Sequence, residues 1–124
     1  MKELLFSQDH EWIKVEDSEA YVGITDYAQS ALGEIVYVEL PEEDEDFDAG
    51  DAFGVVESVK AASDLFLPVA GRILKINEEL EDAPELVNED PYENWMVLIE
   101  ISDDSGLEDL MNEEEYEEFC NKEE

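Results

Sequence analysis

The sequence predicts a mainly β protein built as a sandwich of two antiparallel sheets. Short apolar runs recur through about the first hundred residues, polar turns separate them, and stretches with helical periodicity are few. A length of 124 residues suits one compact domain, so we expect a single domain over residues 1–124. With 44% hydrophobic residues, the chain has enough apolar side chains to build a core.

The predicted strands alternate with turns. The runs at residues 12–15 and 20–24 flank the polar segment 16–19, which predicts an early hairpin. Residues 35–40 are apolar on both faces, which predicts a strand buried between two layers. Further strands are expected over residues 53–59, 65–69, 73–76 and 95–101.

A short helix is expected near residues 26–32. Thr25 or Asp26 can cap its start, because both side chains accept hydrogen bonds from the first-turn N–H groups. Gly33 then ends the helix.

The C-terminal segment, about residues 105–122, is predicted to be helical. Asn112 and Glu115 have the spacing of a capping pair at the start of its last helix. Tyr116, Phe119 and Cys120 then share one face of that helix.

The charge balance restricts the partners. The chain has 38 acidic and 6 basic residues, a formal net charge of -32. Such a surface repels nucleic acid and anionic lipid, favours a monomer, and either steers basic partner proteins or reflects a salt-rich cytoplasm. No apolar run is long enough for a membrane span and no targeting segment is visible, so a cytoplasmic location is expected.

Residues able to form a catalytic centre or metal site are scarce. The chain has one histidine and one cysteine, His10 and Cys120, and no glycine-rich phosphate loop. We expect His10 to be structural and Cys120 to be a small buried apolar residue. The sequence therefore predicts a protein that is not an enzyme.

Lys60 is the most informative basic residue. It lies between two predicted strands, and the residues after it, 61–63, are small. Small neighbours on a turn leave the amine within reach of another protein's active site. From these features alone, Lys60 is either a solubilising lysine or a site of modification.

The segment ESVKA at residues 57–61 resembles the lipoyl-attachment segment of the H protein family of the glycine cleavage system. Other matches follow in the family's order through nearly the whole chain. They are HEW at 10–12, VGIT at 22–25, AQ at 28–29, LGE at 32–34, ELP at 39–41, AGD at 49–51, PV at 68–69, Gly71, Asn77, PELVN at 84–88, PY at 91–92, WM at 95–96, SD at 102–103, Tyr116, Phe119 and Cys120. The chain differs from the family's pattern in the loops at residues 42–44 and 93–94.

The resemblance implies a hammerhead-like barrel-sandwich hybrid of two antiparallel sheets and lipoate in amide linkage to Lys60. It also implies that the lipoylating enzyme, a lipoate ligase or an octanoyltransferase, reads Glu57 and Gly71. An acid-lined cleft for the lipoyl arm is further implied. Its lining residues are expected to be Glu11, Asp64, Asp9, Ile24, Ala28 and Leu32, although each acid can also be a solvated surface group and each apolar residue ordinary core.

The family's role implies a carrier cycle with three enzymes. Glycine decarboxylase loads an aminomethyl group from glycine, aminomethyltransferase removes it, and dihydrolipoamide dehydrogenase reoxidises the reduced arm. A relay that supplies lipoyl or octanoyl groups to other carriers stays open as an alternative. A biotin carrier is disfavoured because Val59 and Ala61 replace the methionines that usually flank a biotinylated lysine. An unmodified acidic interaction module is the remaining alternative.

Overall fold

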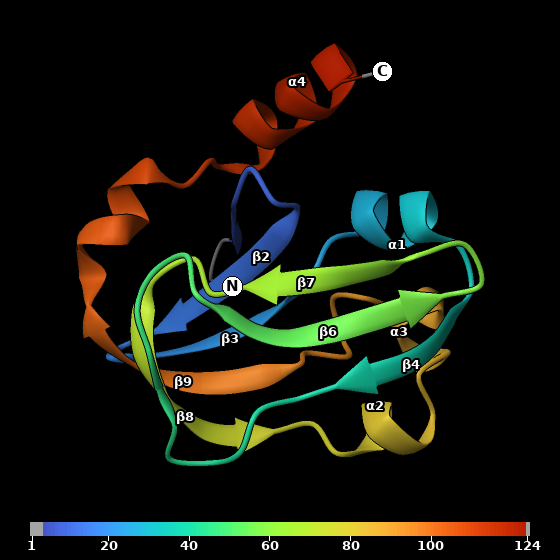
Figure 1. Cartoon of the computed structure of the whole chain (residues 1–124). Helices are drawn as coiled ribbons and strands as arrows, with labels where there is room; N and C mark the ends of the chain where they lie inside the picture. The colour runs from blue at the N-terminus through green and yellow to red at the C-terminus, as the bar shows by residue number, and fades with distance from the viewer. Residues whose placement is uncertain (1–3, 124) are drawn as a thin grey trace.

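The computed structural model describes residues 4–123, with side chains for all of these except residues 104, 105, 122 and 123. Two antiparallel sheets face each other (Figure 1). The larger sheet has the strand order β1 (Leu4–Phe6), β2 (Glu11–Glu16), β3 (Glu19–Ile24), β9 (Val97–Asp103), β8 (Ala70–Ile76), β5 (Asp46–Phe47). The smaller sheet has the order β4 (Ile35–Glu39), β6 (Ala52–Ser58), β7 (Ala62–Phe66). The predicted mainly β sandwich is confirmed.

The early hairpin forms as predicted from β2 and β3. Their register places Trp12 opposite Gly23, and Asp17 makes the turn with a φ of 59°. Gly23 leaves room for the indole, since a Cβ at this position would lie 2.8 Å from ring atoms of Trp12. The pairing therefore needs a glycine opposite the tryptophan.

One apolar core joins the two sheets. The larger sheet contributes buried side chains such as Ile13 and Ile99, and the smaller sheet contributes Ile35, Val56 and Leu65. Each fully buried side chain of this kind stabilises the fold by roughly 1.5–3 kcal/mol. The smaller sheet is held in place through this core, because three strands with one apolar face need another layer to cover it.

The strand predicted over residues 35–40 differs from expectation in its burial. The prediction that this strand is buried on both faces was wrong, because Val36 and Tyr37 are 51% and 46% exposed. β4 lies at the edge of the smaller sheet, and a β-bulge falls between Ile35 and Tyr37. Ile35 and Val38 point into the core, while the extra residue of the bulge and its neighbour face solvent.

The short helix near residues 26–32 is confirmed as α1 (Asp26–Leu32). Thr25 caps it, with its Oγ1 accepting a hydrogen bond from the Ala28 N–H at 3.2 Å. Gly33 ends it with a φ of 85°, and its N–H donates to the Gln29 carbonyl oxygen at 2.9 Å. Two one-turn helices, α2 (Glu79–Asp82) and α3 (Leu86–Glu89), follow β8.

The C-terminal segment is helical as predicted, with a 3-10 helix, η1 (Asp104–Asp109), before α4 (Glu113–Glu123). Asn112 and Glu115 cap α4 reciprocally: the Asn112 N–H donates to Glu115 Oε1 at 3.0 Å, and the Glu115 N–H donates to Asn112 Oδ1 at 2.8 Å. Tyr116, Phe119 and Cys120 lie in a second apolar cluster with Phe6 and Trp12.

His10 and Cys120 have structural surroundings. His10 Nδ1 lies 2.7 Å from the Tyr116 hydroxyl, which in turn lies 2.6 Å from Thr25 Oγ1. The His10 ring also stacks on Tyr27. These contacts attach α4 to the start of α1, and Cys120 is half-buried in the same region. The predicted structural role of His10 is therefore consistent with its contacts.

Candidate functional site

Lys60 lies on the turn that joins β6 to β7, beside α1 (Figure 1). Ser58 organises this turn through both its backbone and its side chain. Its N–H donates to the Ala61 carbonyl oxygen at 2.8 Å, and its Oγ accepts the N–H groups of Lys60 and Ala61, each at 3.1 Å. These hydrogen bonds define the backbone conformation of the turn, while Val59, Lys60 and Ala61 are all exposed.

The chain between α1 and β4 forms the floor beneath Lys60. A Cβ on Gly33 would lie 3.3 Å from Lys60 Cε and 3.7 Å from Cδ, so the lysine stem passes directly over this glycine. The Val59 N–H donates to the Glu34 carbonyl oxygen at 3.0 Å, which ties the turn to the same segment. Gly33 thus ends a helix and makes space for the lysine stem.

Asn88, in α3, holds this floor in place. Its Oδ1 accepts the Ile35 N–H at 2.8 Å, and its Nδ2 donates to the Gly33 carbonyl oxygen at 2.8 Å and to Gln29 Oε1 at 2.9 Å. No local sequence pattern assigns Asn88 this role. Only Gly33, between a predicted helix and a predicted strand, marks this place in the sequence.

Glu11 is a buried carboxyl group that connects the two sheets. It is 1% exposed, and its Oε2 accepts the Phe66 N–H at 2.6 Å, from the end of β7 that is farther from Lys60. Ser7 Oγ donates to Glu11 Oε1 at 3.3 Å. Burial, assisted by the nearby negative charge of Asp9, raises the pKa of Glu11 from 4.5 to about 8 against the lowering effect of these hydrogen bonds.

The other residues predicted for the arm cleft lie in two kinds of environment. Asp9 and Asp64 are exposed, and Asp64 pairs with Val55 on β6. Ile24 is buried, and Ala28 and Leu32 are half-buried against the main core. The cleft role of these residues remains a prediction.

The two residues predicted for recognition by the lipoylating enzyme are separated by the fold. Glu57 is exposed on β6, directly opposite Tyr37 and Ala62 and three residues from Lys60. Gly71 is buried on β8 in the larger sheet, where a Cβ would lie 2.7 Å from the Glu100 carbonyl oxygen. Close packing of β8 on β9 therefore accounts for a glycine at this position.

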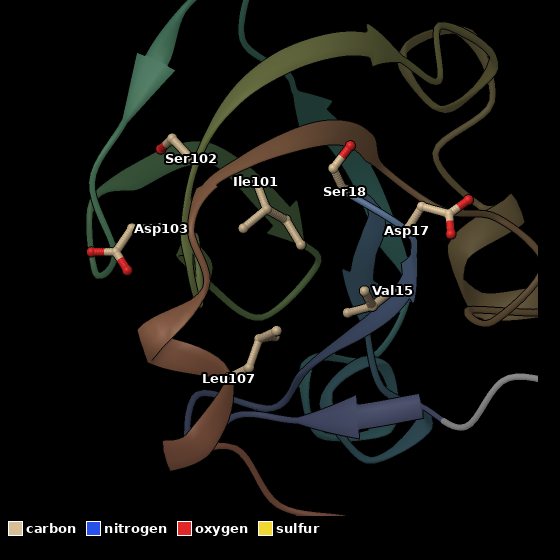
Figure 2. Close-up of a pocket in the computed structure, with 7 residues that line it drawn as sticks. All are labelled: Val15, Asp17, Ser18, Ile101, Ser102, Asp103 and Leu107. Carbon is tan, nitrogen blue, oxygen red and sulfur yellow. The ribbon is translucent and has the colours of Figure 1, made fainter.

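Three surface pockets lie elsewhere. One of about 470 Å3 lies near the β2–β3 turn, with Val15, Ile101 and Leu107 around it (Figure 2). Another of about 910 Å3 lies between β1, β2 and α4, and a third of about 610 Å3 lies between α1 and α4. None of these three is lined by the six residues predicted for the arm cleft.

Among the described residues, no group of three or more His, Cys, Asp or Glu side chains is arranged to hold a metal ion. Within the same part of the chain, no helix has both the length and the apolar character needed to span a membrane.

A hydrogen-bonded turn that presents one exposed lysine above Gly33 is an arrangement suited to an attachment site. The family model described as "Glycine cleavage H-protein" matches residues 4–123. The chain belongs to this family. The family is one of carrier subunits, which agrees with a chain whose most prominent feature is an exposed lysine.

Named relatives and a solved structure support the same assignment. The chain is 62% identical to a glycine cleavage system H protein of Alkaliphilus oremlandii over 97% of this chain and 94% of that protein. It is 58% identical to the corresponding protein of Staphylococcus epidermidis over 94% of each. A crystal structure of the H protein from Mycobacterium marinum matches with a TM-score of 0.86 and 32% identity, covering 99% of this chain and 98% of that chain.

We expect Gly33→Ala to lower the free energy of unfolding by about 1–3 kcal/mol, because a φ of 85° with a ψ of -153° is a region open essentially to glycine. It should also displace the Lys60 stem. Gly50→Ala is the matched control, since Gly50 has a φ of 89° but nothing within 4 Å of a Cβ. Chemical denaturation gives the stability, and NMR of the Lys60 methylene groups gives the displacement. Unchanged Lys60 resonances in Gly33→Ala would contradict the contact.

We expect Glu11→Gln to stabilise the protein more at high pH than at low pH. The pKa of Glu11 in the folded state is raised above its value in the unfolded state. The contribution of protonated Glu11 to the free energy of unfolding is therefore fully present below pH 4.5 and is lost as pH rises through about 8. The melting temperature of the variant should exceed that of the wild type by roughly 5 °C more at about pH 8.5 than at about pH 5. Glu19→Gln, at an exposed position, is the control. A difference in melting temperature that does not change with pH would show that Glu11 has the same pKa in the folded and unfolded states.

Proposed function

We propose that Lys60 carries lipoate in amide linkage and that the chain is the lipoyl carrier of the glycine cleavage system. The observation that carries this proposal is the geometry of the turn. Ser58 fixes the backbone at the root of the lysine, while the Lys60 side chain is exposed. A fixed root with a mobile tip lets one group visit several active sites at high effective concentration.

The residues around Lys60 fit such an attachment. The lysine stem lies over Gly33, where no side chain obstructs it, and the residues on either side of the lysine are exposed. When bound, lipoate supplies a dithiolane that can accept an aminomethyl group and undergo reduction and reoxidation. The protein's part is to hold the root and to leave the amine of Lys60 open to the acylating enzyme.

Glu11 has the properties needed to respond to a cationic cargo. With a pKa of about 8, its carboxyl group holds a proton at neutral pH. A cationic amine brought beside it favours the ionised form, so the carboxyl group releases its proton when the amine arrives. Asp9 supplies further negative charge nearby. We therefore propose that Glu11 and Asp9, together with Asp64, form the acidic side of the arm cleft, with Ile24, Ala28 and Leu32 on its apolar side.

The expected partners follow from the carrier role. They are glycine decarboxylase, aminomethyltransferase, dihydrolipoamide dehydrogenase and the enzyme that lipoylates Lys60. The chain itself contributes no catalysis, and a cytoplasmic location is consistent with this set of partners. Relay of lipoyl groups to other carriers remains the second candidate function, because it uses the same lysine.

Attachment is tested by incubating the purified chain with a lipoate–protein ligase, ATP and lipoate, followed by intact mass and peptide mapping. We expect one lipoyl group on the wild type, located at Lys60, and none on Lys60→Arg. Lys75→Arg, which changes another exposed lysine, should be modified like the wild type. A wild-type chain that stays unmodified, or a lipoyl group found on another lysine, would contradict the proposal.

The two carrier roles are separated by two assays on the lipoylated chain. Support of glycine–bicarbonate exchange by glycine decarboxylase is expected for the glycine cleavage role. Transfer of the lipoyl group from Lys60 to a second apo carrier protein is expected for the relay role. Failure of exchange together with efficient transfer would favour the relay.

A further inference from the structure

The β-bulge in β4 places two apolar side chains in solvent beside the Lys60 turn. Ile35 pairs with Ser58 and Tyr37 pairs with Glu57, so Val36 is the extra residue of the bulge. Without the bulge, the alternation of the strand would turn one of the two side chains inward. With it, both Val36 and Tyr37 are exposed.

Val59 extends this surface to the lysine itself. Val59 is 64% exposed and immediately precedes Lys60, and its N–H donates to the Glu34 carbonyl oxygen at 3.0 Å. Tyr37 lies directly opposite Glu57 across the β4–β6 pair, which places their side chains next to each other on the outer face of the smaller sheet. We call the surface formed by Val36, Tyr37 and Val59 the bulge patch.

The concentration of apolar exposure here is unusual for this chain. Four large apolar side chains are exposed in the described part of the chain, namely Val36, Tyr37, Val59 and Tyr92, and three of them form the bulge patch. The fourth, Tyr92, accepts a hydrogen bond from the Asp26 N–H at 3.0 Å. Exposed apolar side chains gathered in one place indicate an interaction surface.

The charges around the bulge patch indicate what kind of surface fits it. Glu34, Glu39 and Glu57 are exposed on or next to the same two strands. A partner that covers the apolar side chains must therefore place basic groups against this acidic rim, because unpaired like charges would oppose docking.

We propose that the bulge patch is the docking surface for the enzyme that acylates Lys60, which meets it with an apolar surface rimmed by Lys and Arg side chains. The inference rests on the proposed attachment at Lys60. Enzymes that act later work on the distal end of a long arm, whereas the acylating enzyme must bring its active site to Nζ of Lys60. The stem of Lys60 lies over Gly33, so this enzyme comes close to Val59 and β4.

The test is the steady-state rate of Lys60 lipoylation by a lipoate–protein ligase with ATP and lipoate, measured against chain concentration. Val36→Thr/Tyr37→Thr keeps residues that favour strands but removes the apolar surface. We expect KM to rise about tenfold with kcat within about twofold, the result of losing binding that is equal in ground and transition states. Tyr92→Thr, which removes an exposed aromatic side chain outside the bulge patch, should leave KM unchanged.

Val59→Ser provides a second variant, on a turn residue outside the β4 ladder, and should also raise KM. Melting curves establish that each variant is folded. An unchanged KM in both patch variants, or an equal rise in Tyr92→Thr, would overturn the docking proposal while leaving lipoylation of Lys60 intact. Absence of any modification of the wild type would instead overturn the attachment, and the docking proposal with it.

The acidic rim is tested through ionic strength. Wild-type KM should rise with salt, because exposed charges that attract a basic surface are screened. Glu34→Gln/Glu39→Gln should weaken that dependence, and Glu19→Gln/Glu16→Gln, on the β2–β3 hairpin, should not. Equal salt dependence in both double variants would contradict the basic rim of the partner.

Discussion

The inward faces of the two sheets share one apolar core, and the position of Lys60 follows from this contact. The three strands of the smaller sheet expose one face to solvent and contribute Ile35, Val56 and Leu65 to the core on the other. β6 and β7 therefore cannot shift by one residue without turning their apolar side chains outward. Because the register of β6 and β7 is fixed, the backbone of the loop between them is also fixed, and so is the position of the Lys60 backbone.

Local hydrogen bonds also hold the backbone around Lys60. Ser58 closes the turn, and Asn88 ties the end of α1 to the start of β4 beneath it. Gly33 supplies the backbone conformation and the space that this meeting point requires. The result combines a hydrogen-bonded base with an exposed side chain, two properties that a carrier needs together.

The negative charge spread over the surface and the buried carboxyl group of Glu11 have different effects. The net charge of -32 makes most of the surface repel anions and attract basic proteins. Burial raises the pKa of Glu11 to about 8, so the charge of this carboxyl group depends on what lies beside it. The bulge patch adds an apolar surface beside Lys60, where general charge attraction alone would give little specificity.

The sequence by itself determined the fold class, the early hairpin, α1 and its end at Gly33, and the capping pair of α4, because these depend on alternation and on hydrogen bonds between residues close in the chain. It also singled out Lys60 and, through ordered motifs, the family. Only the tertiary structure decided the burial of Glu11, the role of Asn88 and the exposure of Val36 and Tyr37. Each of these depends on a neighbour from a distant part of the chain, or on a bulge whose register is set by the partner strand, and neither can be read from local pattern.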